Sequence, residues 1–154
     1  MEGSYATLYA AMIKKRGNFF IKNKFEINSY CIGDVSLFVF TPEGELEYSF
    51  YYTDHENFDN SPELFRSNEK LQKKTPFTIH SDIYITSRKN TIVFATDALS
   101  EFIFKRLVVK KGLDVILEIM ECQSNEDFFK LMEYYRDSCN MKNDDIAICI
   151  IKDV

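Results

Sequence analysis

The chain has 154 residues, of which 45% are hydrophobic, 15% aromatic and 28% charged. This length suits a single domain, and the apolar and aromatic content is too high for a disordered chain. The 24 acidic and 19 basic residues give a net charge of −5. That charge argues against general electrostatic binding to nucleic acid or to an anionic membrane surface.

Segments that would direct the chain to a membrane or to secretion are not visible. No run approaches the roughly 18 consecutive apolar residues of a membrane-spanning helix, and the N-terminus lacks a basic region followed by an apolar core. The four cysteines are widely spaced, which favours reduced thiols over a disulfide scaffold or a CxxC metal site. We therefore expect a cytoplasmic protein that does not associate with membranes.

The first half of the chain is predicted to form strands. Aromatic and β-branched residues are concentrated in residues 5–14, 25–32, 36–41 and 46–52, and an antiparallel meander is their simplest arrangement. Between the last two, residues 42–45 (Pro-Glu-Gly-Glu) predict a hairpin turn in which Gly44 supplies a positive φ. The polar residues 53–77 predict a long loop, and two further strands are predicted at 79–86 and 91–96.

After Asp97 the apolar residues recur every three or four positions, which predicts helices over residues 99–109 and 113–120. A third helix is expected to begin at Ser124, whose hydroxyl can cap it, and to bury Phe128, Leu131, Met132 and Tyr135. Residues 146–151 are apolar on both faces, as in a strand covered on both sides. Together these elements predict one α+β domain over residues 1–154, an antiparallel β-sandwich with flanking helices.

Acidic residues stand where several of these strands begin or end. Asp34 follows the strand that ends near Ile32, Asp97 follows residues 91–96, and Asp144 and Asp145 precede the closing strand. Carboxylates without nearby His or Cys are typical ligands of Mg²⁺ or Mn²⁺ rather than of Zn²⁺. Taken singly, each has a structural alternative: a turn former for Asp34, a helix cap for Asp97, and ordinary loop acids for the other two.

Four short motifs resemble, in the same order, those of the metal-dependent protein phosphatases, the type 2C serine/threonine phosphatases. Residues 30–38 (YCIGDVSLF) are similar to the family's "GDS" strand, and residues 4–8 (SYATL) to its "gATa" strand. Residues 94–102 (FATDALSEF) resemble the "laSDGlwd" turn, and residues 143–148 (NDDIAI) the closing "DNmTvivv" strand. The form "TDAL" is closest to a bacterial branch, in which a segment like residues 58–64 also follows the hairpin.

The resemblance implies that Asp97 and Asp144 are ligands of Mg²⁺ or Mn²⁺, and that Asp34 and Glu101 belong to an additional, weaker metal site. In the family, water bound by two such ions attacks phosphoserine or phosphothreonine directly. The family's first strands and helices, and the "DGhGG"-like turn that carries its bridging aspartate, have no counterpart in this sequence. We therefore expect the C-terminal portion of a type 2C phosphatase-like domain, inactive or incomplete alone, and assign no catalytic or substrate-binding side chain.

Two alternatives remain open. The chain could be a pseudophosphatase that binds a protein partner instead of a phosphoprotein substrate, or the resemblance could be accidental and the fold an unrelated α+β binding domain. Without the family's first helices an apolar sheet face would be exposed, and a homodimer or a domain swap could cover it. The residues predicted for that face are Tyr9, Phe19, Phe20, Tyr48 and Tyr51.

Overall fold

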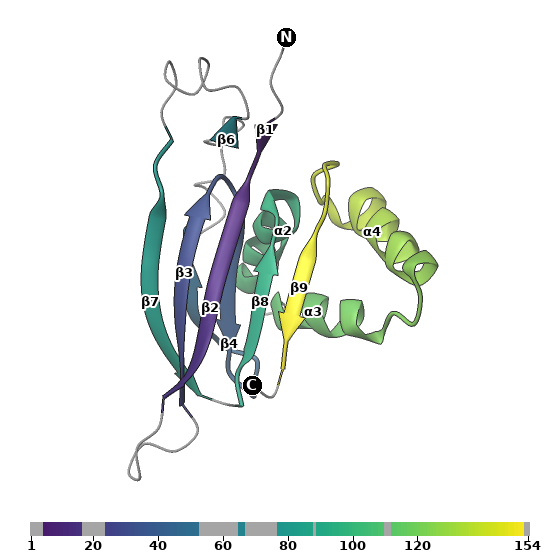
Figure 1. Ribbon diagram of the computed structural model, residues 1–154. Coiled ribbons are helices and arrows are strands. Elements are labelled where there is room, and N and C mark those ends of the chain that lie inside the picture. Colours follow the sequence, from purple (N-terminus) through teal and green to yellow (C-terminus); the bar gives the residue numbers. More distant parts are fainter. Residues whose placement is uncertain are drawn as a thin grey trace.

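In the part of the chain that the structure describes, two antiparallel sheets and three helices form the main body of the α+β fold (Figure 1). The first sheet has the order β2-β3-β7, made of β2 (Leu8–Arg16), β3 (Lys24–Ile32) and β7 (His80–Ser87). The second has the order β5-β4-β8-β9, made of β5 (Leu46–Phe50), β4 (Ser36–Phe40), β8 (Thr91–Ala95) and β9 (Ile148–Ile151). A short pair, β1 (Tyr5–Ala6) and β6 (Phe65–Arg66), lies outside these two sheets. The computed structural model describes residues 5–16, 24–52, 65–66, 77–87, 89–109 and 112–152.

The sequence predicted one meander of the first four long strands, and the structure does not have it. Strands β2 and β3 pair in the first sheet, β4 and β5 pair in the second, and the chain passes between the sheets at Gly33, whose φ is +100°. The reason lies in β4, in which every residue from Ser36 to Phe40 is buried. A strand apolar on both faces needs cover on both, and the centre of a three-layered fold provides it.

The four-stranded sheet is the middle layer. One of its faces packs against α2 (Asp97–Val108), α3 (Gly112–Glu121) and α4 (Asn125–Cys139), which Figure 1 shows together on one side of the molecule. The core between this face and the helices includes Phe38, Phe40, Val93, Leu99, Phe102, Ile103, Ile116 and Tyr135. The other face of the four-stranded sheet packs against the three-stranded sheet around Ile27, Leu37, Val39 and Ile92.

Two tyrosines join the sheets at one side. The rings of Tyr48 and Tyr84 stack with centroids 3.9 Å apart. The Tyr84 hydroxyl donates a hydrogen bond to Glu47 at 2.5 Å, and the Tyr48 hydroxyl donates one to Asp82. Because each tyrosine reaches a carboxylate of the opposite sheet, this contact fixes the relative position of the two layers.

Several local predictions are confirmed. In the hairpin, the Gly44 N–H donates to the Thr41 carbonyl at 3.0 Å, and the φ of Gly44 is +91°. At the start of α4, the Ser124 hydroxyl accepts a hydrogen bond from the Asp127 N–H at 3.1 Å. All four cysteines are free thiols.

The closing strand differs from its prediction. It begins at Ile148 instead of residue 146, and Cys149 is exposed. Strand β9 is an edge strand of the described sheet, and its two faces are covered unequally: Ile148 and Ile150 pack against the larger core, while on the other face Ile151 packs between the sheets but Cys149 is exposed. The predicted cover on both faces therefore holds for the isoleucines of β9 and fails at Cys149.

Candidate functional site

Three of the four predicted metal ligands lie at one end of the four-stranded sheet. In its register, the start of β4 lies beside the end of β8 (Ser36 opposite Ala95), and the end of β8 lies beside the start of β9 (Ala95 opposite Ile148). Asp34 precedes β4, Asp97 follows β8 as the first residue of α2, and Asp144 precedes β9. Antiparallel pairing therefore brings together carboxylates that are far apart in the sequence.

Lys142 lies between two of these carboxylates. Its Nζ donates a hydrogen bond to Asp97 Oδ2 at 2.9 Å and contacts Asp144 Oδ2 at 3.2 Å. The Asp97 side chain is 17% exposed and the Lys142 side chain 36%, so the first pair is partly shielded from water. The two carboxylates are thus close neighbours that share one ammonium group.

The charges and burial of the group shift the pKa values of its members. Burial, and next the negative charge of Asp97, raise the pKa of the Asp34 carboxyl above its ordinary value. Asp144 behaves in the opposite way, since the Asp145 N–H and the Lys142 ammonium lower its pKa. The hydrogen bond to Asp97 raises the pKa of Lys142, which is therefore held in its charged form. Of these carboxylates, Asp34 is therefore the one whose negative charge is least neutralised by nearby positive groups.

Glu101, the fourth predicted ligand, has a partner of its own. It lies one turn after Asp97 on α2, and its Oε1 is 2.5 Å from the Nζ of Lys105. This is an i,i+4 ion pair along the helix surface, a common way to stabilise an exposed helix. No contact with Asp34, Asp97 or Asp144 draws Glu101 into their group in this arrangement.

The resemblance implies Mg²⁺ or Mn²⁺ at these residues, so the donor set can be tested for fit. Among the described residues, no group of three or more Asp, Glu, His or Cys side chains is placed to hold a metal ion. The oxygens of Asp97 and Asp144 that would face an ion face the Lys142 ammonium instead. As arranged, these residues do not fit a divalent cation, and the metal assignment stays a prediction.

Lys142 was not singled out in the sequence, although a signal existed. It stands two residues before Asp144, so any turn that brings Asp144 to the sheet end carries a cation there as well. Arg136 was missed too: its Nη2 donates to the Asp144 carbonyl at 2.7 Å, which holds the segment before β9 against α4. These contacts depend on the path of the chain after α4, which sequence periodicity does not report.

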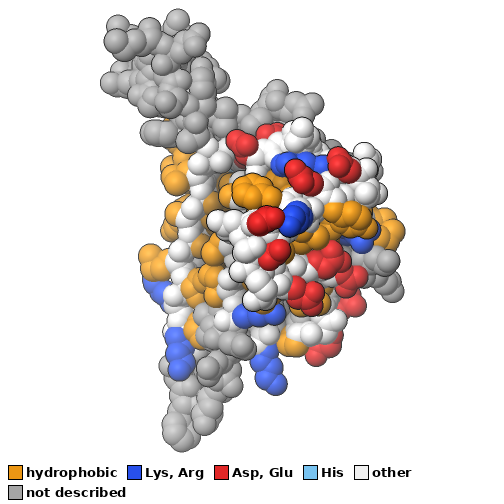
Figure 2. Space-filling model, turned by 90° about the vertical axis from the view of Figure 1, so that its right-hand side faces the viewer, with side chains coloured by type: hydrophobic (Ala, Val, Ile, Leu, Met, Phe, Trp, Pro, Cys, Tyr) orange, Lys and Arg blue, Asp and Glu red, His pale blue; other side chains and the backbone are white. Residues whose placement is uncertain are grey.

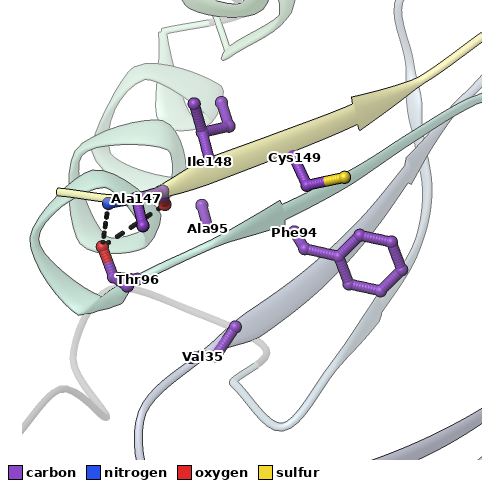
Figure 3. A pocket seen from close by; sticks show the side chains of 7 residues that line it. All are labelled: Val35, Phe94, Ala95, Thr96, Ala147, Ile148 and Cys149. Atoms are coloured by element: carbon purple, nitrogen blue, oxygen red, sulfur yellow. Dashed lines mark hydrogen bonds between the residues drawn. The ribbon is translucent and has the colours of Figure 1, made fainter. Parts of the chain in front are cut away.

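We call the end of the four-stranded sheet that carries Asp34, Asp97, Lys142 and Asp144 the acidic corner. A small pocket of about 200 Å³ lies next to this corner. Figure 3 shows Thr96 pointing towards Ala147, whose N–H donates to Thr96 Oγ1 at 3.0 Å, so the hydroxyl joins the end of β8 to the start of β9. The residues that line the pocket are Val35, Phe94, Ala95, Thr96, Ala147, Ile148 and Cys149. None of these side chains is charged, so the pocket itself offers apolar contacts and no group to bind a phosphate.

The outer face of the three-stranded sheet is the second feature of interest. Its apolar side chains are 40–63% exposed; they are Leu8, Met12, Tyr30, Ile83 and Ile85. The register places Met12 opposite Asn28 and Asn28 opposite Ile83, so these side chains form neighbouring rows across β2, β3 and β7. On the helical side, by contrast, Figure 2 shows acidic and basic side chains spread among the apolar ones.

The sequence predicted different residues for an exposed apolar face, and that prediction is wrong for the three of them that the structure describes, Tyr9, Tyr48 and Tyr51. Tyr9 and Tyr48 pack between the sheets around Ile27 and Leu37. Successive residues of a strand point to opposite faces, so Tyr9 lies inward where Leu8 lies outward. Tyr51 packs against the larger core on the helical side, whereas Phe19 and Phe20 lie outside the described residues.

Comparisons of the chain with models of protein families, with curated proteins and with solved structures found no match. The similarity to type 2C phosphatases therefore stays a resemblance of motifs. Within the described residues, none of the helices combines the length and the apolar character needed to cross a membrane.

Proposed function

We propose that this chain is a type 2C phosphatase-like domain that acts as a protein-binding module and does not by itself hydrolyse phosphoserine or phosphothreonine. The exposed apolar face of the β2-β3-β7 sheet carries this proposal. The order of the four sequence motifs, and the meeting of Asp34, Asp97 and Asp144 at one sheet end, support the phosphatase-like part.

The composition of this sheet face favours burial by another protein surface. Leu8, Met12 and Ile83 are 54%, 52% and 63% exposed although they lie on regular strands. Contiguous exposed apolar side chains of this kind usually mark an interaction surface. Burying them stabilises a complex by about 25 cal/mol for each Å² of apolar area removed from water.

One end of the same face is polar, as the rim of an interface is. Lys14 and Lys24 are exposed there, and Arg16 Nε pairs with Glu26 Oε2 at 2.6 Å. An apolar centre with charged residues at its margin is typical of surfaces that bind proteins. We take a second copy of the chain as the first partner to test, because a homodimer would cover the apolar face of both copies at once.

Metal-dependent hydrolysis of a phosphoprotein is the competing function. Its residues are close together, which favours it, but Lys142 takes up the oxygens of Asp97 and Asp144 that would face an ion. Its test is turnover of p-nitrophenyl phosphate or a phosphoserine peptide in Mn²⁺. We expect none, and turnover that Asp97→Asn abolishes would contradict the proposal.

Sedimentation velocity over a range of concentrations tests the binding surface. We expect self-association that Ile83→Asp weakens, since a carboxylate in place of the most exposed apolar side chain of this sheet face would have to be desolvated on association. Phe129→Asp is the matched control, because Phe129 is 66% exposed on α4, far from this sheet in the fold. Self-association lost in the control and retained in Ile83→Asp would refute the sheet face as the binding surface.

A further inference from the structure

The ammonium of Lys142 stands where the resemblance leads one to expect a metal ion. It neutralises Asp97 and Asp144 from 2.9 Å and 3.2 Å, and both contacts are made by the Oδ2 atoms. We propose that Lys142 is an internal replacement for a divalent cation, so that this corner of the fold is held together without metal. The inference rests on these contacts and would stand even if the protein-binding function failed.

The backbone on both sides of Lys142 is anchored, which keeps its side chain in place. Helix α4 is capped by Asn140 in the left-handed conformation, and the next residue, Met141, is 5% exposed and belongs to the larger core. The Met141 N–H donates to the Tyr135 carbonyl at 3.1 Å. Because the chain is already fixed at this point, Lys142 loses little additional backbone freedom on pairing with the two carboxylates.

The segment is fixed on its other side as well. Arg136 Nη2 donates to the Asp144 carbonyl at 2.7 Å, and the Ala147 N–H donates to Thr96 Oγ1 at 3.0 Å. Lys142 is therefore one of several contacts that hold the segment between α4 and β9 against the end of β8. It differs from the others in that its partners are two negative charges, which would repel each other without it.

A bound metal and the Lys142 ammonium compete for the same oxygens. Mg²⁺ binds carboxylate oxygens at about 2.0–2.1 Å and keeps several of its waters, so it needs the space between Asp97 and Asp144. An ammonium hydrogen-bonded to both oxygens fills that space. The structure thus predicts that the wild-type chain has no divalent site at this corner, and that removal of the Lys142 charge creates one.

The first part of the test uses the wild-type chain. Mn²⁺ is titrated and its free concentration is followed by electron paramagnetic resonance, while the thermal midpoint is measured in EDTA, MgCl₂ and MnCl₂. We expect no saturable binding at this corner and the same midpoint in all three solutions. Saturable Mn²⁺ binding by the wild-type chain that Asp97→Asn removes would overturn the proposal.

The second part uses Lys142→Met, which keeps the length of the side chain without its charge. We expect a lower midpoint in EDTA, saturable Mn²⁺ binding, and a midpoint raised by roughly 5–10 °C when Mn²⁺ exceeds its Kd about 100-fold. Adding Asp97→Asn should remove both effects. A Lys142→Met chain that neither binds Mn²⁺ nor gains thermal stability from it would show that the ammonium does not replace a metal.

Lys130→Met serves as the matched control. Lys130 also pairs with a carboxylate, that of Glu126 at 2.7 Å, but this pair lies on the surface of α4 with both side chains more than half exposed. We expect this variant to keep the wild-type midpoint closely and to bind no Mn²⁺. Equal Mn²⁺ binding by the two variants would mean that the ion binds elsewhere, and would contradict the proposal.

Discussion

Asp97→Asn is the most informative single change, because two interpretations of the acidic corner predict opposite signs. If Asp97 faced only other carboxylates, removing its charge would relieve repulsion from Asp34 and Asp144 and would stabilise the fold. The structure places Lys142 Nζ at 2.9 Å from Asp97 Oδ2, so the change also removes an attraction. We expect the lost attraction to dominate and the free energy of unfolding to fall.

The size of the effect follows from two contributions. Exposed ion pairs contribute about 0.2–1 kcal/mol, and with Asp97 only 17% exposed we take the upper part of that range. Asp97 is also an acid in the first turn of α2, where a negative charge is worth about 0.3–1 kcal/mol against the helix dipole. Lys142 keeps Asp144 as a partner in this variant, so its charge is not left unpaired and adds no further cost. We therefore expect the free energy of unfolding to fall by about 1.5 kcal/mol, which lowers the thermal midpoint by roughly 3–6 °C.

The assay is urea unfolding followed by far-ultraviolet circular dichroism, together with a thermal scan. Glu126→Gln is the matched control, because Glu126 is likewise an acid in the first turn of a helix and pairs with a lysine. Its pair is largely exposed, so we expect a loss of only about 0.5 kcal/mol. An Asp97→Asn variant as stable as the wild type, or more stable, would refute the role assigned to Lys142.

Three further predictions concern other parts of the chain. Asp34→Asn should raise the free energy of unfolding at pH 7, because burial and the charge of Asp97 raise the pKa of Asp34 and so oppose its ionised form in the fold. Unfolding curves measured at several pH values should show this gain in stability shrinking as the pH falls towards about 3.9. A difference between variant and wild type that is constant or inverted with pH would contradict the prediction. Ser124→Ala should cost about 1 kcal/mol in urea unfolding, because it removes the cap of α4, whereas an unchanged stability would mean that the cap is not needed. In native protein at pH 8, a disulfide reagent should label the exposed Cys149 of a Cys31→Ser variant well before it labels the buried Cys31 of a Cys149→Ser variant, because burial raises the pKa of the Cys31 thiol to about 11. Labelling of Cys31 as fast as that of Cys149 would contradict this burial.

The local elements were predictable because their signals lie within a few residues. The Gly44 turn, the Ser124 cap and the helical repeat that places Met132 and Tyr135 in the core all depend on short-range geometry. The arrangement of the strands was less accessible. Whether β4 follows β3 in the same sheet depends on which layer covers it, and that is decided by contacts with residues more than fifty positions away, such as Val93 and Phe102.

The candidate site shows the same division. Sequence motifs selected Asp34, Asp97 and Asp144, and the register of β4, β8 and β9 brings them to one sheet end. Glu101 was chosen with them by its motif, but its side chain pairs with Lys105. A motif specifies position along the chain, whereas the partner of a charged side chain depends on which opposite charge lies nearest in space.

From the sequence alone came the α+β class, the three helices of the second half, the Ser124 cap, the free thiols and the acidic residues that flank the strands. Only the tertiary structure decided that the strands divide into two sheets, that Leu8, Met12 and Ile83 point outward where Tyr9 points inward, and that Lys142 lies between Asp97 and Asp144. The physical reason is the range of the interactions. Turns, caps and periodicity are settled between near neighbours, but sheet pairing, exposure and charge neutralisation depend on residues that meet only after the whole chain has folded.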